Sequence, residues 1–316
     1  MTYKNAKLRA PVFNPFHILK CMERPEIRKV GTIDIDLVET TPLVFRERLL
    51  RFEYVREGYW GNGTGDSYFR FIDTEDDSPT PPFAPGCHLG SAYAEGDRAY
   101  TYGVDLWGES VIRVFSSRDL EEWEAGTALE LPGRGIYNTS VCRGDGRYIM
   151  AIELGEPEEL VGRRFTIFFA ESQDLLAWKM LPQEHAYSRD RYTACPTIRF
   201  LGGHYYMIYL EQMPGTTYQP HMVRSRDLRS WEESTLNPLM APSDDDRKIA
   251  KRFFSPEQRE LVAKAVNLNN SDVDLCEHQG RTVINYSWGN QHGTEFLAEA
   301  VFEGGLEELF NGFFPG

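Results

Sequence analysis

Five residues of this 316-residue chain share one position in a repeated pattern and could together do acid–base chemistry. Each lies eight residues before the middle of a similar turn motif, where a β-prone run begins. The five are Glu39, His88, Asn138, Cys195 and Asp272. Two carboxyl groups can act as general acid and general base, so Asp272 and Glu39 are the first candidates for catalysis. His88 and Asn138 are candidates for substrate binding, and core packing is an equal alternative for His88.

The fourth copy of the pattern carries Cys195 at the matched position, so a neighbouring polar side chain would have to substitute there. Thr193 and Tyr192 are the nearest, and we favour Tyr192 because its side chain reaches farther. Arg191 could bind a substrate carboxylate or phosphate, because its planar guanidinium matches both groups. A surface ion pair between Arg191 and Asp190 is the simpler interpretation.

Three further carboxyl residues stand where the strand after a turn should end. They are Asp105, Glu153 and Glu211. We include Glu211 as a third catalytic candidate. The sequence does not decide which of these strand ends points toward the other candidates. The similar positions of Glu153 and Glu211 also fit a shared structural role.

The densest polar stretch before a predicted strand contains Asp272 and Asp274. Strand alternation would put both side chains on one face. They could pair as acid and base or bind a cation such as Ca²⁺, and turn capping is the plainer alternative. The spacing of His and Cys residues is not that of a metal site, so we expect no cofactor and no catalytic metal.

The stretch from Tyr286 to Glu295 covers the end of the next predicted strand and its loop. Trp288 could bind substrate by stacking its aromatic face on a ring of the ligand. Packing between neighbouring sheets is at least as good an interpretation of Trp288. His292 could bind substrate and donate a proton, but an ordinary loop histidine is the simpler alternative.

The elements that must position these residues come from an internal repeat. Three segments share the pattern Ser-x-Asp-Leu-x-x-Trp, and their tryptophans (Trp123, Trp178 and Trp231) are 55 and 53 residues apart. Because the copies are equivalent and a binding site is not, we assign them a structural role. The aspartate should cap a tight turn. The leucine and the tryptophan should fill the gap between neighbouring units.

Around each turn motif two short β-prone runs predict a hairpin, and in three copies a third run follows. Units of about 50 residues with three or four antiparallel strands have the size of a propeller blade. The sequence therefore predicts an all-β fold, a five-bladed β-propeller that residues 1–316 form as one domain. The predicted blades span roughly residues 34–80, 84–130, 134–182, 189–240 and 268–316. A helical insertion at 243–266 precedes the last blade, with Ser255, Pro256 and Gln258 as its helix start.

These hairpins and the repeated Ser-x-Asp-Leu-x-x-Trp segments resemble the five-bladed propellers of glycoside hydrolase family 43, with relatives in families 32, 62, 117 and 130. The resemblance covers the chain from about residue 34 to its end. It implies an acid and a base carboxylate near the starts of innermost strands, a third carboxylate that tunes the acid, and hydrolysis with inversion. Glu39 and Asp272 are the matching residues, and His292 matches a family 117 histidine in type and rough location. The Asp-Pro and Glu-Gly-Pro motifs of family 43 are absent, so the chain is not a standard member.

Composition and charge exclude several functions. Lys and Arg total 34, and Asp and Glu total 48, which gives a net charge of −14. Nucleic acids and anionic membranes favour basic surfaces, so we expect neither as a partner. The five cysteines are far apart in the sequence, and the first residues carry no apolar stretch. We therefore expect no disulfide framework, no secretory signal peptide and a cytoplasmic protein.

We interpret the chain as a glycoside hydrolase that removes a terminal sugar from an oligo- or polysaccharide. Carboxylates in a pocket on the propeller axis would supply the acid and the base. Two alternatives stay open: a glycoside phosphorylase on the same scaffold, and a non-catalytic propeller that binds carbohydrate or protein. The sequence leaves the oligomeric state open.

Overall fold

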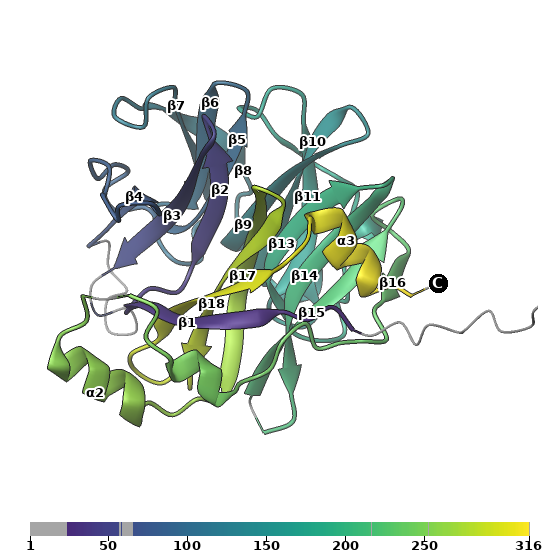
Figure 1. Cartoon of the computed structure of the whole chain (residues 1–316). Coiled ribbons are helices and arrows are strands. Elements are labelled where there is room, and N and C mark those ends of the chain that lie inside the picture. The colour runs from purple at the N-terminus through teal and green to yellow at the C-terminus, as the bar shows by residue number, and fades with distance from the viewer. Residues whose placement is uncertain (1–23, 57, 59–65, 216, 252, 316) are drawn as a thin grey trace, which may run out of the picture.

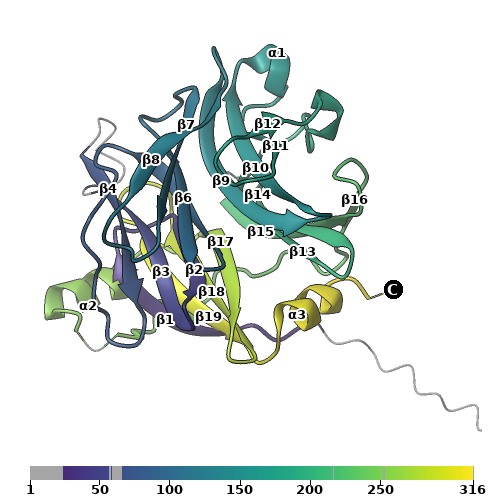
Figure 2. The ribbon, with the colours of Figure 1, turned by 90° about the horizontal axis from the view of Figure 1, so that it is seen from above.

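The described part of the chain forms five antiparallel sheets around a common axis (Figure 1, Figure 2). The structure is a computed structural model that describes residues 24–56, 58, 66–215, 217–251 and 253–315. The predicted all-β, five-bladed propeller is confirmed. The prediction about a signal peptide concerns residues 1–23 and lies outside the described residues.

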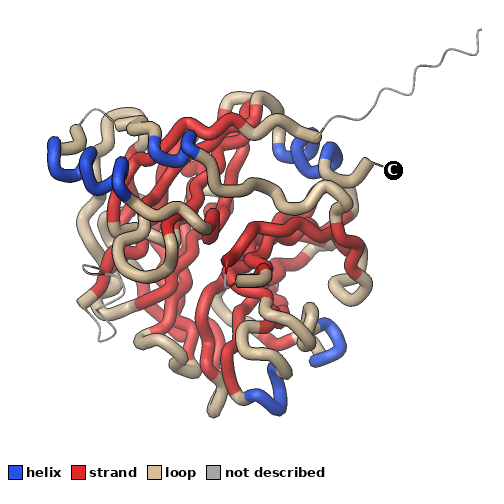
Figure 3. The backbone as a smooth tube through the Cα atoms, turned by 90° about the horizontal axis from the view of Figure 1, so that it is seen from below, coloured by secondary structure: helices blue, strands red, loops and turns tan. Residues whose placement is uncertain are grey.

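Each sheet places one strand at the axis, and these innermost strands contact one another in a closed ring (Figure 3). They are β2 (Thr40–Phe45), β5 (His88–Glu95), β9 (Gly135–Gly144), β13 (Thr193–Leu201) and β17 (Asn269–His278). A hairpin at each predicted turn motif joins them to the second strands. The second strands are β3 (Arg48–Arg56), β6 (Arg98–Val104), β10 (Arg147–Glu156), β14 (His204–Met213) and β18 (Arg281–Gly289).

The outer strands complete the blades. The third strands are β4 (Ser67–Asp73), β7 (Val111–Ser117), β11 (Thr166–Ser172), β15 (Thr217–Ser225) and β19 (Phe296–Phe302). In three blades the fourth strand follows directly in sequence, as β8 (Glu124–Glu130), β12 (Lys179–Met180) and β16 (Trp231–Glu233). The first blade has three strands within the described residues.

The last blade takes its fourth strand from the other end of the chain. Strand β1 (Arg28–Ile35) pairs antiparallel with β19, so the sheet order is β1-β19-β18-β17. This pairing joins the two ends of the described chain and closes the ring of blades. The repeat pattern predicts a first blade that begins near residue 34, so the pairing of β1 with the last blade was not predicted.

The repeated Ser-x-Asp-Leu-x-x-Trp segment is a capped turn between third and fourth strands. In its last copy, Asp227 Oδ1 accepts hydrogen bonds from the amides of Arg229 (2.9 Å) and Ser230 (2.8 Å). Leu228 has φ 60° and is fully buried, and Ser225 Oγ accepts from its amide at 2.9 Å. The other two copies make the same contacts.

The tryptophan of each copy packs on the preceding blade. Trp231 stacks on Phe169, Trp178 meets Tyr102 edge-on, and Trp123 stacks on Phe83. The structural role assigned to this segment is therefore confirmed, because its contacts lie within and between blades.

Helices are short and lie outside the sheets. They are α1 (Glu158–Val161), α2 (Pro256–Lys264) and α3 (Leu306–Gly312), with 3-10 turns at Gln183–His185 and Asp244–Arg247. The predicted helix before the last blade is confirmed as α2, with its capping box: Ser255 Oγ accepts from the Gln258 amide, and the Gln258 side chain accepts from the Ser255 amide. Of the helices that the structure describes, none is both long and apolar enough to cross a bilayer.

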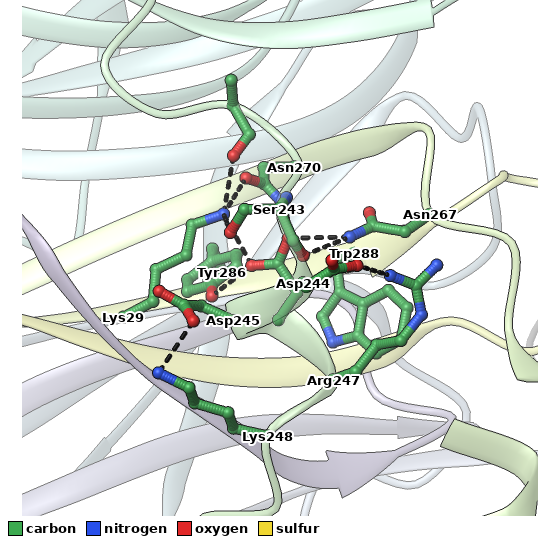
Figure 4. A network of polar contacts seen from close by, with 12 residues as sticks. Lys29, Ser243, Asp244, Asp245, Arg247, Lys248, Asn267, Asn270, Tyr286 and Trp288 are labelled. Carbon is green, nitrogen blue, oxygen red and sulfur yellow. Dashed lines mark hydrogen bonds and ion pairs between the residues drawn. The ribbon is translucent and has the colours of Figure 1, made fainter. Parts of the chain in front are cut away.

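A buried ion pair fastens the insertion to the closing strand. Lys29 on β1 lies 2.6 Å from Asp246, and their side chains are only 9% and 0% exposed. Figure 4 shows Lys29 reaching toward Ser243 and Asn270, whose side-chain oxygens accept from its ammonium group at 3.3 and 2.8 Å. Tyr286 on β18 donates to Asp246 Oδ1 at 2.7 Å. The insertion, β1 and the last blade therefore share one polar network.

Candidate active site

A cavity of about 310 Å³ lies where the innermost strands of the propeller begin. Four of its lining residues are carboxylic acids. Its lining comprises Val38, Glu39, Leu89, Trp107, Tyr137, Asn138, Glu153, Arg164, Phe165, Tyr192, Cys195, Leu210, Tyr218, Asp272, Gln291 and Glu295. The predicted site residues Glu39, Asn138, Tyr192 and Asp272 are thus brought together in one cavity.

Backbone bulges in three innermost strands present residues to this cavity. Leu89, Cys195 and Asp272 have φ of 53°, 49° and 50°, and the strand register shifts beside each of them. Left-handed backbone of this kind is costly for residues other than glycine and is often found at functional sites. The bulge turns one residue of each strand toward the axis, at the same place in three blades.

Glu153 enters the cavity from β10, the second strand of the third blade. It is 3% exposed, and its Oε2 accepts hydrogen bonds from the Cys195 amide at 2.7 Å and from Asn138 Nδ2 at 3.0 Å. Burial raises the pKa of Glu153 to about 7, the charge of Asp272 adds to that rise, and the two donors oppose it. The side chain is therefore largely protonated below neutral pH.

Glu295, just before β19, is the second carboxylic acid with a raised pKa. Its Oε1 accepts from the Gln291 amide at 2.5 Å, and its Oε2 is buried with no hydrogen-bond partner among the described residues. Burial raises the pKa of Glu295 to about 7, and the charge of Asp272 adds to it. A Cβ atom at Gly289 would lie 2.4 Å from Oε2, so only glycine leaves room for this carboxyl group.

Asp272 lines the same cavity as Glu153 and Glu295, and its charge contributes to the raised pKa of both. Its Oδ2 accepts from Ser287 Oγ at 3.1 Å. Burial raises the pKa of the Cys195 thiol well above its usual value, and the charges of Asp272 and Glu153 add to the shift. A thiol with a raised pKa stays protonated, so Cys195 is not an activated nucleophile.

Aromatic rings form the outer wall of the cavity. Tyr192 packs between Phe165 and Tyr218, with ring centroids 5.6 and 5.3 Å away. Trp107 is 38% exposed at the mouth, and the guanidinium of Arg56 lies 4.2 Å from its ring centroid. Aromatic faces beside carboxyl groups suit a ligand that has both C–H faces and hydroxyl groups.

The basic residue on the cavity wall, Arg164, already has protein partners. Arg164 forms an ion pair with Glu156 at 2.7 Å, and it donates to the Tyr137 hydroxyl at 2.8 Å. Its side chain is more than half exposed. Arg164 is the one arginine or lysine among the described residues that line the cavity.

The axis continues below the cavity as a narrow channel of about 30 Å³. This volume holds only a few water molecules. Glu39 and Asp272 line both the cavity and the channel, together with Asn138 and Cys195. Glu39 and Asp272 therefore border a space large enough for a sugar unit and a second space that is large enough only for water.

Five predicted site residues do not line the cavity. His88 is fully buried, and its Nδ1 lies 2.6 Å from the Tyr54 hydroxyl; burial lowers its pKa to about 4. The bulge explains the difference, because it turns Leu89 toward the axis instead. Trp288 is also fully buried and stacks on Phe296 of the same blade, so it packs in the core, whereas the alternative placed this packing between neighbouring sheets.

The other three lie farther from the axis. Glu211 accepts from the Tyr209 hydroxyl at 3.0 Å and pairs with Arg191 at 3.3 Å, so these two predicted residues bind each other. Arg191 also pairs with Glu233, rather than with Asp190 as the simpler interpretation had it. His292 is exposed on its loop. None of these three residues lines the cavity.

The prediction that Asp272 and Asp274 share one face is met only in part, because both line the channel but only Asp272 also lines the cavity. The register shifts between Ser271 and Asp274, so strict alternation does not hold across these residues. Asp274 instead pairs with Arg199 at 2.5 Å and lines the channel without lining the cavity. Within the described residues, no group of three or more His, Cys, Asp or Glu side chains is arranged to hold a metal ion.

Sequence reasoning missed Glu295 as a site residue and passed over Cys195. Glu295 depends on the folding of the 290–295 loop, for which the sequence carries no repeat signal. Cys195 did fall on the matched position, and the count could have found it had its residue type not argued against it.

Comparison with known proteins finds similar folds. No known family profile and no curated protein matches the chain. A structure of BT0996, described as an RGII complex, is 15% identical, with a TM-score of 0.58 over 87% of this chain and 92% of that one. A structure of the GH130 family of mannoside phosphorylases, described as containing hydrolases of β-1,2 mannosidic linkages in Candida mannan, is 11% identical, with a TM-score of 0.58 over 89% and 95%.

A thermostable family-43 glycoside hydrolase is also similar. It is 17% identical, with a TM-score of 0.50 over 69% of each chain. At such identities the likeness concerns the fold. This chain therefore has the five-bladed propeller architecture that several families of glycoside hydrolases share.

Proposed function

We propose that the protein hydrolyses a glycosidic bond at a terminal sugar bound in the axial cavity. One observation carries the proposal: four carboxyl groups, those of Glu39, Glu153, Asp272 and Glu295, surround one cavity with an aromatic wall. Two of them have a pKa of about 7 beside the charge of Asp272. Glycoside hydrolysis needs this combination of a protonated and an ionised carboxyl group.

The base and the acid would act on different sides of the bound sugar, the base toward the channel and the acid toward the cavity. Glu39 and Asp272 line both spaces, so either can activate a water molecule on the channel side. A protonated acid is needed on the cavity side, where the leaving group departs. Since the channel is too narrow for a sugar, the bound sugar is the end of its chain. The RGII complex described for one similar structure is consistent with a carbohydrate ligand.

Charge favours hydrolysis over phosphorolysis. A phosphate dianion would be repelled by the ionised carboxylates of the cavity, and Arg164, the basic residue of the wall, is already paired with Glu156. A phosphorylase would need a free cationic group beside the bond that breaks. We therefore propose water as the acceptor.

The test is a mass-spectrometric screen of plant and algal oligosaccharides, with and without inorganic phosphate. The proposal expects loss of one sugar without phosphate, and loss of that activity in Asp272→Asn. Turnover that requires phosphate would replace it with a phosphorylase. If oligosaccharides bind but none is consumed, the propeller is a binding module.

A further inference from the structure

The third and fourth blades offer no carboxyl group at the starts of their innermost strands. Asn138 and Cys195 occupy the matched positions there. The nearby carboxyl group comes from Glu153 on the second strand, β10, and it binds both residues. This bridge places a carboxyl group from a second strand at the boundary of two blades.

The two oxygens of Glu153 differ in their partners. Oε2 accepts from both the Cys195 amide and the Asn138 side chain, so it is the oxygen that acts as an acceptor. Oε1 has no hydrogen-bond partner among the described residues. Unlike Oε2 of Glu295, it is not fully enclosed by protein atoms. In the protonated acid the proton therefore sits on Oε1, the oxygen that accepts no hydrogen bond from the described residues.

Glu295 offers a less accessible proton. Its Oε1 is the acceptor for the Gln291 amide, so its proton would sit on Oε2. That oxygen is enclosed and lies against Gly289. A general acid has to come within hydrogen-bond reach of the leaving oxygen, and Glu153 satisfies this condition better.

We propose that Glu153 is the general acid of this site, and that the Cys195 amide and Asn138 are positioning groups that aim its Oε1 proton at the glycosidic oxygen. The assignment rests on the proposed hydrolysis. As the bond between the anomeric carbon and the glycosidic oxygen breaks, the Oε1 proton moves to that oxygen. Water bonds to the anomeric carbon and gives its proton to an ionised carboxylate, Asp272 or Glu39. Solvent then exchanges protons with both groups and restores the starting state.

The proton supply suits neutral pH. Burial raises the pKa of Glu153 to about 7, so a large fraction carries the proton that catalysis needs. The alkaline limb of kcat/KM should then fall near pH 7, where this proton is lost.

Aryl glycosides with different leaving groups test the assignment in the full chain. A panel of 4-nitrophenyl and 2,4-dinitrophenyl glycosides, run beside natural oligosaccharides, compares leaving groups that need or do not need a proton. Glu153→Gln keeps an acceptor oxygen for Asn138 and the Cys195 amide, so the fold should persist. Its kcat on oligosaccharides should fall by roughly 10²–10⁴-fold, its kcat on 2,4-dinitrophenyl glycosides by less than about tenfold, and its alkaline limb should disappear.

Matched variants make each outcome decisive. Glu303→Gln, on the surface with Arg28, should match the wild type on every substrate. Asn138→Ala removes a donor that favours the ionised form, so it should move the alkaline limb to higher pH. Asp272→Asn or Glu39→Gln, whichever removes the base, should lose activity on both aryl classes, because no leaving group replaces a base.

Two failures can be told apart. If Glu153→Gln loses all substrates equally, or if Glu295→Gln shows the leaving-group pattern instead, the assignment to Glu153 is overturned while hydrolysis stands. If the wild type cleaves no glycoside in either panel, the proposed function falls and the assignment falls with it.

Discussion

Burying a carboxylic acid has a cost that depends on pH, and this cost makes single residues of the cavity testable without a substrate. Glu295 is 1% exposed, and its pKa is raised to about 7 from an ordinary value of 4.5. The folded state therefore binds this proton more tightly than the unfolded state. Between pH 4.5 and 7 the group reduces stability progressively as pH rises, and above pH 7 the reduction is complete.

Glu295→Gln should remove this pH dependence. The amide oxygen can still accept from the Gln291 amide, and the variant carries no charge to bury. The free energy of unfolding of the variant relative to the wild type should rise between pH 4.5 and pH 8 by up to about 3 kcal/mol. Urea unfolding at the two pH values measures it. A difference that is the same at both would contradict a raised pKa at Glu295.

Trp107 tests the outer end of the cavity. It is partly exposed at the mouth, where a second sugar unit would lie if the terminal unit fills the cavity. Trp107→Ala should raise KM for an oligosaccharide about three- to tenfold, since stacking contacts contribute about 1 kcal/mol. The kcat value should change less. A matched loss on a monosaccharide aryl glycoside would show that Trp107 acts on the reacting sugar instead.

At the scale of the strand, the bulges decide which residues meet. Counting from the turns found Glu39, Asn138 and Asp272, because each hairpin keeps its length from turn to axis. The same count gave His88, whereas the bulge puts Leu89 at the cavity. A bulge adds a residue without a clear mark in the sequence. The distance along a blade could therefore be predicted, but the direction of each side chain could not.

The repeated turn offers a test of element stability. Asp227→Ala removes the acceptor for the Arg229 and Ser230 amides, while Leu228 and Trp231 remain. Loss of such a cap costs about 1 kcal/mol. Urea unfolding should show that loss for Asp227→Ala and almost none for Asp190→Ala, which lies on an exposed loop outside the turn. Equal midpoints for Asp227→Ala and the wild type would contradict a capping role.

At the scale of the whole molecule, what the sequence reveals is local. Each blade carries its own turn, hairpin and tryptophan, so five blades could be counted before any contact was known. The pairing that closes the ring of blades could not be predicted in this way, because it has no repeated motif. Strand β1 belongs to the last blade through pairing with β19, more than 260 residues away in sequence. Glu295 was not predicted as a site residue for a similar reason, since only the folded ring brings its loop close to Asp272.

The ion pair between Lys29 on β1 and Asp246 in the insertion should stabilise the closed ring of blades. Lys29 and Asp246 are both buried, so removing one partner leaves the other charge without compensation. Lys29→Met or Asp246→Asn alone should lower the free energy of unfolding by about 3–5 kcal/mol. The double variant should lose clearly less than the sum, which a double-mutant cycle measures. The exposed pair Lys264–Glu260 on α2 is the matched control, and its removal should cost less than about 1 kcal/mol.

Hydrogen exchange locates the effect of the same pair. The amides of Thr32 and Ala250 join β1 to the insertion through bonds to Lys248 and Thr32 oxygens, of 2.7 and 2.9 Å. If the ion pair holds the closure, these amides should exchange faster in Lys29→Met than in the wild type, while amides of β10 change less. Uniform acceleration across all blades would instead mean that the ring opens only when the whole molecule unfolds. In that case the ion pair would stabilise the whole fold and would have no particular effect on the pairing of β1 with β19.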